Sequence, residues 1–266
     1  MQVAIQASPL LDLGFLNQPL ATNRWPLIMT RRRWIADEVH DNRALLLGAN
    51  AQHLVRVLRA QVGQQFEIAV NGEVKLGTVV GLSDHRAEFE LGEDLRSAPL
   101  LDLTLLVSIF KFDRMEWAIE KATELGISNL IPAIARRTDV HLVKAANKRV
   151  DRWRRVAHEA AQQSRRISAP EIASPTKLAD AIATIAGTKI LLAETEQENT
   201  LKSRLHRASA PMTLAFGPEG GWTEDEIRHF EAAGWLTASL GSTILRAETA
   251  IIAAVAITAS ELSQSA

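Results

Sequence analysis

The chain has 266 residues, of which 47% are hydrophobic, and its formal net charge is −1. This is enough apolar material for one large or two smaller domains, and any nucleic-acid binding must rest on local basic patches. The absence of cysteine excludes disulfides, thiolate catalysis and cysteine-ligated metals. No apolar run approaches the roughly 20 residues of a membrane span, so the composition agrees with a cytosolic enzyme.

Residues 1–30 differ from the rest of the chain. Pro9, Pro19 and Pro26 break the segment, and its apolar residues keep no regular period. A secretory signal is excluded because the segment lacks a basic start and Asp12 interrupts its apolar stretch. We interpret residues 1–30 as a peripheral N-terminal extension, with Met29 as an alternative start of the protein.

Residues 31–96 show a pattern of short strands and turns. Asn71-Gly72 is a strong hairpin signal between two of the strands, and a short helix is expected at Gln52–Arg59. The candidate strands are Ala44–Leu47, Gln65–Val70, Glu73–Val80 and Arg86–Leu91. The pattern predicts a small β-barrel domain over residues 31–96, joined to the remainder by a linker at 95–99.

Basic residues of this first segment are candidate RNA contacts. They are Arg31, Arg32, Arg33, His53, Arg56 and Arg59. A single arginine here is better explained as a solvated surface group. The run Arg31–Arg33 is a stronger candidate, because clustered guanidinium groups suit phosphates.

From residue 100 onward long apolar strands alternate with helices. The expected strands are Leu101–Phe110, Asn129–Ala135, Lys189–Ala193, Met212–Phe216 and Trp235–Leu240. The expected helices are Asp113–Leu125, Lys144–Ser164 and Glu248–Leu262. Alternation of this kind predicts a parallel sheet covered on both faces. We therefore assign residues 100–266 to a single α/β domain.

A basic stretch lies between Arg136 and Arg166. Its mid-helix cations form either a solvated face or an RNA surface, with neither favoured. Arg136 and Arg137, which follow a strand, and Arg165 and Arg166, at a helix end, are better RNA candidates because sites form where loops converge. Such residues would neutralise phosphates and add little sequence selectivity.

Two glycine-containing loops in the last third predict a cofactor site. Gly217-Pro-Glu-Gly-Gly221 follows a buried strand, and Thr223 with Glu226 forms a capping box for the next helix. Leu240-Gly-Ser-Thr-Ile-Leu-Arg-Ala-Glu-Thr-Ala250 follows the next strand. Loops at neighbouring strand ends would build one crevice. Neither a Walker motif nor G-x-G-x-x-G is present, and no acidic residue ends the second strand, so phosphate-binding and nicotinamide sites are disfavoured.

At these two loops the chain resembles the bacterial small-subunit ribosomal RNA uridine N3-methyltransferases, a branch of the knotted SPOUT class. Phe112-Asp-Arg-Met-Glu-Trp-Ala-Ile-Glu-Lys-Ala-Thr-Glu-Leu-Gly126 resembles the opening helix of that family. The resemblance extends from about Arg31 to the C-terminus and is most specific in the last third. The chain departs from the family at Thr243, where the family usually has arginine.

The resemblance implies a fold, a reaction and partners. The fold is α/β, a SPOUT-like parallel sheet with a C-terminal trefoil knot, preceded by a small PUA-like β-barrel that binds RNA. The reaction is transfer of a methyl group from S-adenosylmethionine to N3 of a specific uridine in 16S ribosomal RNA, without a metal. The partners are the small ribosomal subunit and a second copy of the chain, and no membrane. The apolar helix Glu248–Leu262 also fits either the core or a dimer interface.

The same resemblance implies site residues. The cofactor would be held by Phe216, Gly217, Pro218, Glu219, Gly220, Leu240, Gly241, Ser242, Ile244, Leu245 and Arg246, and Arg114 joins the RNA candidates. Arg246 is the expected catalytic residue, supporting negative charge on the uracil carbonyls, and a structural hydrogen bond to loop carbonyls is its alternative role. Glu219 would hold the turn or contact the cofactor's amino group. Glu248 is a base or a helix cap, and the helix dipole favours the cap.

Two other classes of function remain open. A nucleotide-dependent oxidoreductase is disfavoured by the missing ribose acid. A catalytically silent RNA-binding module of the same fold is the stronger alternative if Thr243 marks loss of activity.

Overall fold

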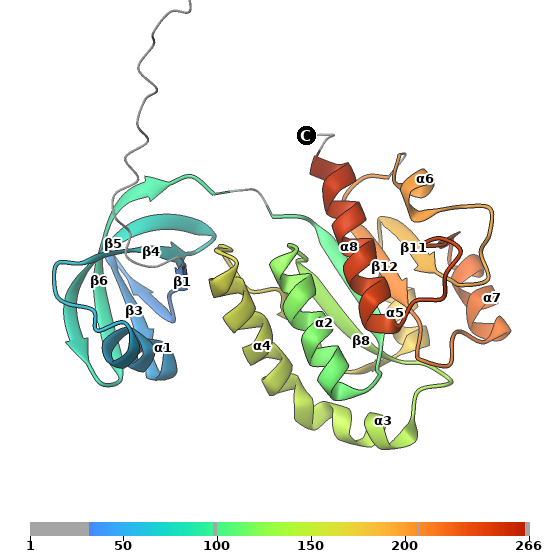
Figure 1. The fold of residues 1–266 in the computed structure, drawn as a ribbon, viewed down its shortest axis with the longest axis horizontal. Helices are drawn as coiled ribbons and strands as arrows, with labels where there is room; N and C mark the ends of the chain where they lie inside the picture. The colour runs from blue at the N-terminus through green and yellow to red at the C-terminus, as the bar shows by residue number, and fades with distance from the viewer. Residues whose placement is uncertain (1–31, 98–99, 207, 264–266) are drawn as a thin grey trace, which may run out of the picture.

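The computed structural model describes residues 32–97, 100–206 and 208–263, and two β-sheets organise them (Figure 1). Residues 1–31, and with them the predicted extension and Arg31, lie outside the described residues. The first sheet is built from residues 34–95, and the second from residues 103–238. The helices, apart from a short one near residue 50, belong with the second sheet.

The first sheet has six strands in the order β1-β4-β5-β6-β3-β2. Their bounds are β1 Trp34–Ile35, β2 Glu38–His40, β3 Arg43–Leu47, β4 Gln65–Val70, β5 Glu73–Ser83 and β6 Arg86–Leu95. All pairs are antiparallel except β1 with β4. The sheet curls around a core that includes Trp34, Phe66 and Phe89. All four predicted strands are present, and β5 and β6 run longer than predicted.

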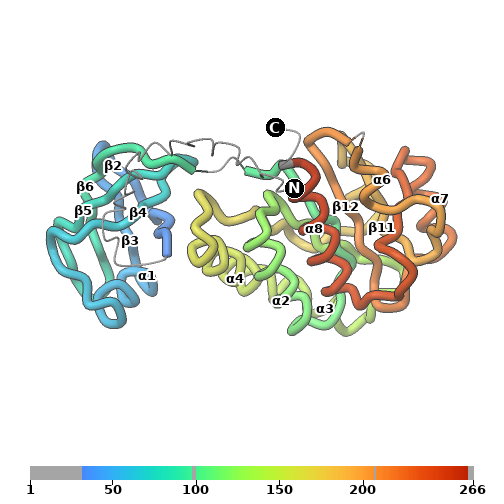
Figure 2. Tube along the Cα trace, turned by 45° about the horizontal axis from the view of Figure 1, so that its top comes forward, coloured from blue at the N-terminus to red at the C-terminus, as the bar shows by residue number. Residues whose placement is uncertain are grey.

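Local turn chemistry in this sheet follows the sequence. Asn71 and Gly72 have φ of 50° and 84°, the left-handed conformation that a tight hairpin between β4 and β5 requires. The predicted helix at Gln52–Arg59 begins earlier, as α1 (Gly48–Gln52), and continues as the π turn η1 (His53–Val57). It covers one open side of the curled sheet (Figure 2).

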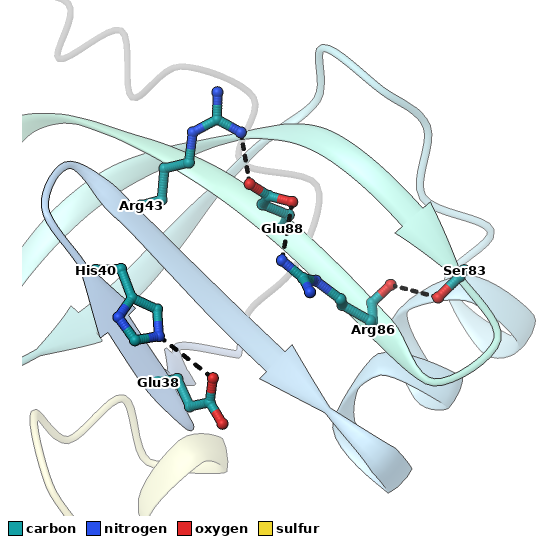
Figure 3. Close-up of polar contacts among 6 residues, drawn as sticks. All are labelled: Glu38, His40, Arg43, Ser83, Arg86 and Glu88. Carbon is teal, nitrogen blue, oxygen red and sulfur yellow. Dashed lines mark hydrogen bonds and ion pairs between the residues drawn. The ribbon is translucent and has the colours of Figure 1, made fainter.

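Charged side chains on the exposed side of this sheet pair with one another. Figure 3 shows Arg43 and Arg86 both meeting Glu88 of β6, and His40 near Glu38 of β2. The hydrogen bond from Arg43 lowers the pKa of the Glu88 carboxyl. The two arginines therefore share one carboxylate of the sheet.

The second sheet is parallel throughout, as predicted. Its strand order is β10-β8-β7-β12-β11-β13, and β9 pairs with β8. The bounds are β7 Leu103–Ser108, β8 Asn129–Ile134, β9 Glu171–Ile172, β10 Thr176–Lys177, β11 Thr188–Leu192, β12 Met212–Phe216 and β13 Leu236–Ala238. Side chains alternate between the faces, so that Leu105 and Val107 enter one core and Leu106 enters the other.

Helices cover both faces of this sheet. They are α2 Phe112–Glu124, α3 Val140–Ala146, α4 Val150–Gln163, α5 Leu178–Thr184, α6 Leu201–Leu205, α7 Glu224–Ala232 and α8 Ala247–Ser263. Residues of α2, α4, α6 and α8 share one core, and α5 and α7 contribute to the other. The single helix predicted at Lys144–Ser164 is instead α3 and α4 joined by a 3₁₀ turn at Asn147–Arg149. Asn147 is a poor helix former because its side chain competes for backbone hydrogen bonds.

A buried ionic cluster joins the two halves of the molecule. Among the helices around the second sheet, α4 is the one nearest the first sheet in both views (Figures 1 and 2). Glu67 of β4 is 3% exposed and accepts hydrogen bonds from Arg33, at 2.9 Å, and from Arg165. The amide of Arg33 also donates to the carbonyl oxygen of Gln162 at 3.1 Å. These contacts set the first sheet against the end of α4.

Candidate functional site

A cavity of about 460 Å³ opens at the carboxyl ends of three adjacent strands, β12, β11 and β13. Its walls come from the segments after each strand, with Lys111 and Arg114 from the start of α2. The lining residues include Leu192–Thr195, Phe216–Glu219, Gly221, Trp222 and Ala238–Glu248. This is the edge at which ligands bind in open α/β sheets.

The two predicted glycine loops meet here, although their strands are not neighbours. Strand β11 lies between β12 and β13, which corrects the expectation of adjacent strand ends. The segment Leu192–Thr195 after β11 therefore forms part of the cavity and was not predicted. It contains no glycine or recognisable motif, and only the strand order reveals its position.

Contacts with Trp222 and Arg137 fix the conformation of the first glycine loop. A Cβ on Gly217 would lie 3.2 Å from the ring of Trp222, whose Nε1 donates to the carbonyl oxygen of Leu192 at 3.2 Å. The Arg137 guanidinium donates to the carbonyl oxygens of Gly220, at 2.8 Å, and Trp222, at 3.2 Å. Gly220 is exposed and lies outside the cavity lining. The predicted capping box at Thr223 and Glu226 is present.

The second glycine loop forms the outer wall of the cavity. Gly241 has φ of 121°, which other residue types rarely adopt, and the space where its Cβ would lie is open. Thr243 is exposed at this wall, Ile244 is 82% exposed, and the Arg246 side chain is also exposed. The loop therefore offers backbone groups, an apolar side chain and a guanidinium to a ligand.

Arg114 places a positive charge between two carboxylates of the cavity. Its Nη1 lies 3.2 Å from an oxygen of Glu219, and its Nε lies 3.7 Å from an oxygen of Glu248. Glu248 lies in the first turn of α8 and is 9% exposed. Arg114, Glu219 and Glu248 thus connect α2, the first glycine loop and α8. The sequence patterns did not predict that these three segments meet.

The basic residues predicted among residues 31–96 have varied surroundings. Arg32 lies 4.8 Å over the Trp34 ring, and burial lowers its pKa. His53 is half-buried against Trp34, and burial, followed by the charge of Arg32, lowers its pKa. Arg56 is exposed and pairs with Asp84 at 3.0 Å, and Arg59 is exposed.

The basic residues predicted among residues 100–266 also differ in their surroundings. Arg136 is exposed, and Arg137 supports the glycine loop. Arg165 pairs with buried Glu67. Arg166 is 9% exposed, donates to the carbonyl oxygen of Thr123 at 2.8 Å, and burial lowers its pKa to about 10. Arg165 and Arg166 thus each make a structural contact, and their assignment to RNA stays a prediction.

The described residues show neither a metal cluster nor a membrane helix. Within residues 32–97, 100–206 and 208–263, no three histidine, aspartate or glutamate side chains gather in a way that could hold a metal ion. No helix in the same ranges combines the length and apolar character needed to cross a bilayer.

The cavity offers a small molecule apolar surface, backbone hydrogen-bonding groups and side chains of both charges, among them Lys111, Arg114 and Arg246. The glycine loops expose backbone donors and acceptors, Phe216, Leu240 and Ile244 offer apolar surface, and Glu194 and Glu219 carry negative charge. These features fit S-adenosylmethionine, which combines an adenosine with a sulfonium and an amino acid. They do not resemble a phosphate cradle.

Comparisons with known proteins agree with this chemistry. A family model described as an RNA methyltransferase domain matches residues 96–259. A ribosomal RNA small subunit methyltransferase E from Synechocystis is 33% identical over 86% of this chain and 77% of its own length. The Bacillus subtilis protein of the same name is 30% identical over 77% of this chain and 85% of its own length. The crystal structure of the Neisseria gonorrhoeae protein of that name, bound to S-adenosyl methionine, has a TM-score of 0.75, with 28% identity over 85% of this chain and 95% of that one.

Proposed function

The chain belongs to the ribosomal RNA small subunit methyltransferase E family, and on this premise we propose that it methylates N3 of a specific uridine in 16S ribosomal RNA with S-adenosylmethionine as the methyl donor. The observation that carries this proposal is the cavity at the ends of β11, β12 and β13, with Arg246 at its rim. That cavity combines a place for the cofactor with a cation where the acceptor base would enter.

We propose that both glycine loops hold the cofactor. The residues in these roles are Phe216, Gly217, Pro218, Glu219, Leu240, Gly241, Ser242, Ile244, Leu245 and Arg246. Gly220 contributes through its carbonyl bond to Arg137 rather than by lining the cavity. Glu194 and Glu219 favour the cationic parts of the molecule. When bound, S-adenosylmethionine supplies a methyl group made electrophilic by its sulfonium, so no metal is required.

Arg246 is the proposed catalytic residue. N3 of uracil carries a proton, and its loss leaves negative charge shared with O2 and O4. A guanidinium at the rim stabilises this charge, and a fixed donor is more effective in a dry cleft than in water. The side chain needs no rearrangement to reach the opening, because it is exposed and lines the cavity.

The RNA surface comprises the first sheet and the cavity side of the second. We propose that residues 31–96 form a PUA-like RNA-binding domain, with Arg32, His53, Arg56 and Arg59 as contacts and Arg136 on the second domain. We also propose that the segment 239–247 completes a trefoil knot. The course of the chain supports this proposal. It runs from α7, on one face of the sheet, through β13, which lies beside β11, to α8 on the other face.

A homodimer in the cytoplasm is the proposed working form. Helix α8 carries an apolar sequence beyond its buried side, with Ala256 exposed and Ile252 half-buried. Small side chains let a second copy approach closely. Sedimentation equilibrium tests the dimer, and Ile252→Glu should produce a monomer.

Two measurements test the proposed function: binding of the cofactor and formation of the methylated RNA. Calorimetry should show S-adenosylmethionine binding, and incubation with small ribosomal subunits that lack the modification should yield N3-methyluridine in 16S RNA by mass spectrometry. RNA binding without cofactor binding would instead support the catalytically silent RNA-binding module. It would also indicate that Thr243, in place of the family's usual arginine, marks loss of activity.

A further inference from the structure

A second cavity of about 400 Å³ adjoins the first. Its lining residues are Asp113, Arg114, Trp117, Arg246, Glu248 and Thr249. Arg114, Arg246 and Glu248 line both cavities. A flat molecule in the second cavity would therefore lie directly beside one bound in the first, with these three side chains at the boundary.

The three shared side chains carry complementary hydrogen-bonding groups. A guanidinium only donates hydrogen bonds, and a carboxylate only accepts them. The boundary thus provides two donors, Arg114 and Arg246, and one acceptor, Glu248. The edge of uracil presents the inverse set, since its O2 and O4 accept and the N3–H between them donates. Cytosine would bring a bare N3 lone pair toward the carboxylate, which is repulsive.

Trp117 supplies a surface for a base. It lies on α2, lines the second cavity and is 46% exposed, whereas Trp34 and Trp153 are fully buried. Nucleobases stack on aromatic side chains whatever their sequence, with a gain of roughly tenfold or more in affinity. An exposed indole beside a cluster of donors and an acceptor therefore matches a base turned out of its RNA stack.

Glu248 is positioned to receive a proton. Its side chain is held near Arg114, with the Arg114 Nε 3.7 Å from a carboxylate oxygen, and the residue is 9% exposed. A cap of α8 was the favoured sequence interpretation, but the carboxylate also forms part of both cavity walls. It can therefore serve a ligand from the first turn of the helix.

We infer that the second cavity is the uracil subsite of the proposed reaction, in which Trp117 stacks on the base, Arg114 and Arg246 bind its carbonyls, and Glu248 accepts the N3 proton. This inference rests on the proposed function. The N3–H bond breaks, the proton passes to a Glu248 oxygen, and the electron pair stays on the imide, where the two guanidinium groups stabilise it. N3 then forms its bond to the methyl carbon, the carbon–sulfur bond breaks with its electron pair remaining on sulfur, and Glu248 releases its proton to solvent.

The stacking role is tested by nucleoside binding. With the protein saturated by S-adenosylhomocysteine, saturation-transfer NMR should detect uridine binding and little cytidine binding. Trp117→Ala should abolish the uridine signal, Trp117→Phe should retain most of it, and Glu124→Ala on the same helix should leave it unchanged. Equal signals for Trp117→Ala and the wild type, or for uridine and cytidine, would overturn the subsite.

The proton-acceptor role is tested by a pH profile. Glu248→Gln should lower single-turnover methylation about 100-fold or more at neutral pH. The deficit should shrink at alkaline pH, because N3 then loses its proton without help. Glu261→Gln, on the same helix, is the control and should behave as wild type. A Glu248→Gln deficit that is constant across pH would assign Glu248 a structural role and overturn its part in the proposal.

Failure of the subsite can be distinguished from failure of the proposed function. If the wild type neither binds S-adenosylmethionine nor methylates 16S RNA, the proposed function fails; if it does both while Trp117→Ala and Glu248→Gln match their controls, only the subsite fails. Sedimentation of Trp117→Ala should match the wild type. A change in oligomeric state would identify Trp117 as an interface residue between two copies and overturn its stacking role.

Discussion

Arg137 donates a hydrogen bond from its guanidinium to the carbonyl oxygen of Gly220 at 2.8 Å, joining the segment after β8 to the glycine loop after β12. The same nitrogen lies 3.2 Å from the carbonyl oxygen of Trp222. Hydrogen bonds from a charged donor contribute about 1.5–3 kcal/mol each. The shape of the proposed cofactor loop therefore depends on a residue that the sequence pattern assigned to RNA.

Replacing Arg137 with alanine should weaken S-adenosylmethionine binding about tenfold, because the loop would lose its two carbonyl contacts. Arg136→Ala is the matched control, since its exposed side chain makes neither contact. Calorimetry at fixed ionic strength measures both. Equal affinities for the two variants would show that Arg137 does not support the loop.

Valine at Gly217 or Gly241 should abolish cofactor binding for two different reasons. At Gly217 the new side chain would collide with the Trp222 ring, 3.2 Å from the added Cβ. At Gly241 the backbone φ of 121° would be forbidden to a β-branched residue. Gly81→Ala, where an added Cβ makes only ordinary contacts, is the control. A folded Gly217→Val protein with normal affinity would remove this loop from the site.

Arg246→Ala should lower the single-turnover rate by about 10²–10³ with a smaller effect on KM, because the guanidinium acts on charge that develops during the reaction. Arg246→Lys should restore only part of the rate, since it keeps the charge but not the planar fork. Arg228→Ala on the exposed face of α7 provides the control. Normal rates at saturating RNA and cofactor would end the catalytic assignment.

Alanine at Arg166 should affect thermal stability, whereas alanine at Arg136 should affect RNA binding. Arg166→Ala should lower the melting temperature, because it removes a buried contact to Thr123. Arg136→Ala should leave the melting temperature unchanged and reduce the salt dependence of RNA binding by about one unit of slope. Calorimetric melting and filter binding over a range of salt concentrations measure the two effects. A reduced salt slope for Arg166→Ala alone would identify Arg166, and not Arg136, as the RNA contact.

Glu196 should make folding sensitive to acid. Hydrogen bonds from Thr237 Oγ1 and from the amides of Asn199 and Glu198 lower its pKa from 4.5 to about 2. Because the folded-state pKa is depressed, this stabilisation is complete above pH 4.5 and is lost as the pH falls toward about 2. Glu196→Gln should lower the melting temperature at pH 7 and flatten its decline over that window. Parallel acid profiles for the two proteins would contradict the assignment.

The local elements and the two cofactor loops could be predicted from the amino-acid sequence. The hairpin at Asn71-Gly72, the capping box at Thr223 and Glu226, and the strand Met212–Phe216 lie where the sequence predicts them. Each depends on turn chemistry, capping or burial within a few residues. The resemblance of these loops to a known family names many of the residues that line the cavity, although Gly220 lies outside the lining.

Which distant segments meet depends on how the elements pack in three dimensions. Strand β11 lies between β12 and β13, and this brings Leu192–Thr195 into the cavity. Arg114 contacts Glu219, which lies 105 positions away in the sequence, and Arg165 forms an ion pair with Glu67. A pattern of residues shows that an arginine ends a helix, but not whether solvent or a buried carboxylate faces it, because the facing group comes from a remote part of the chain.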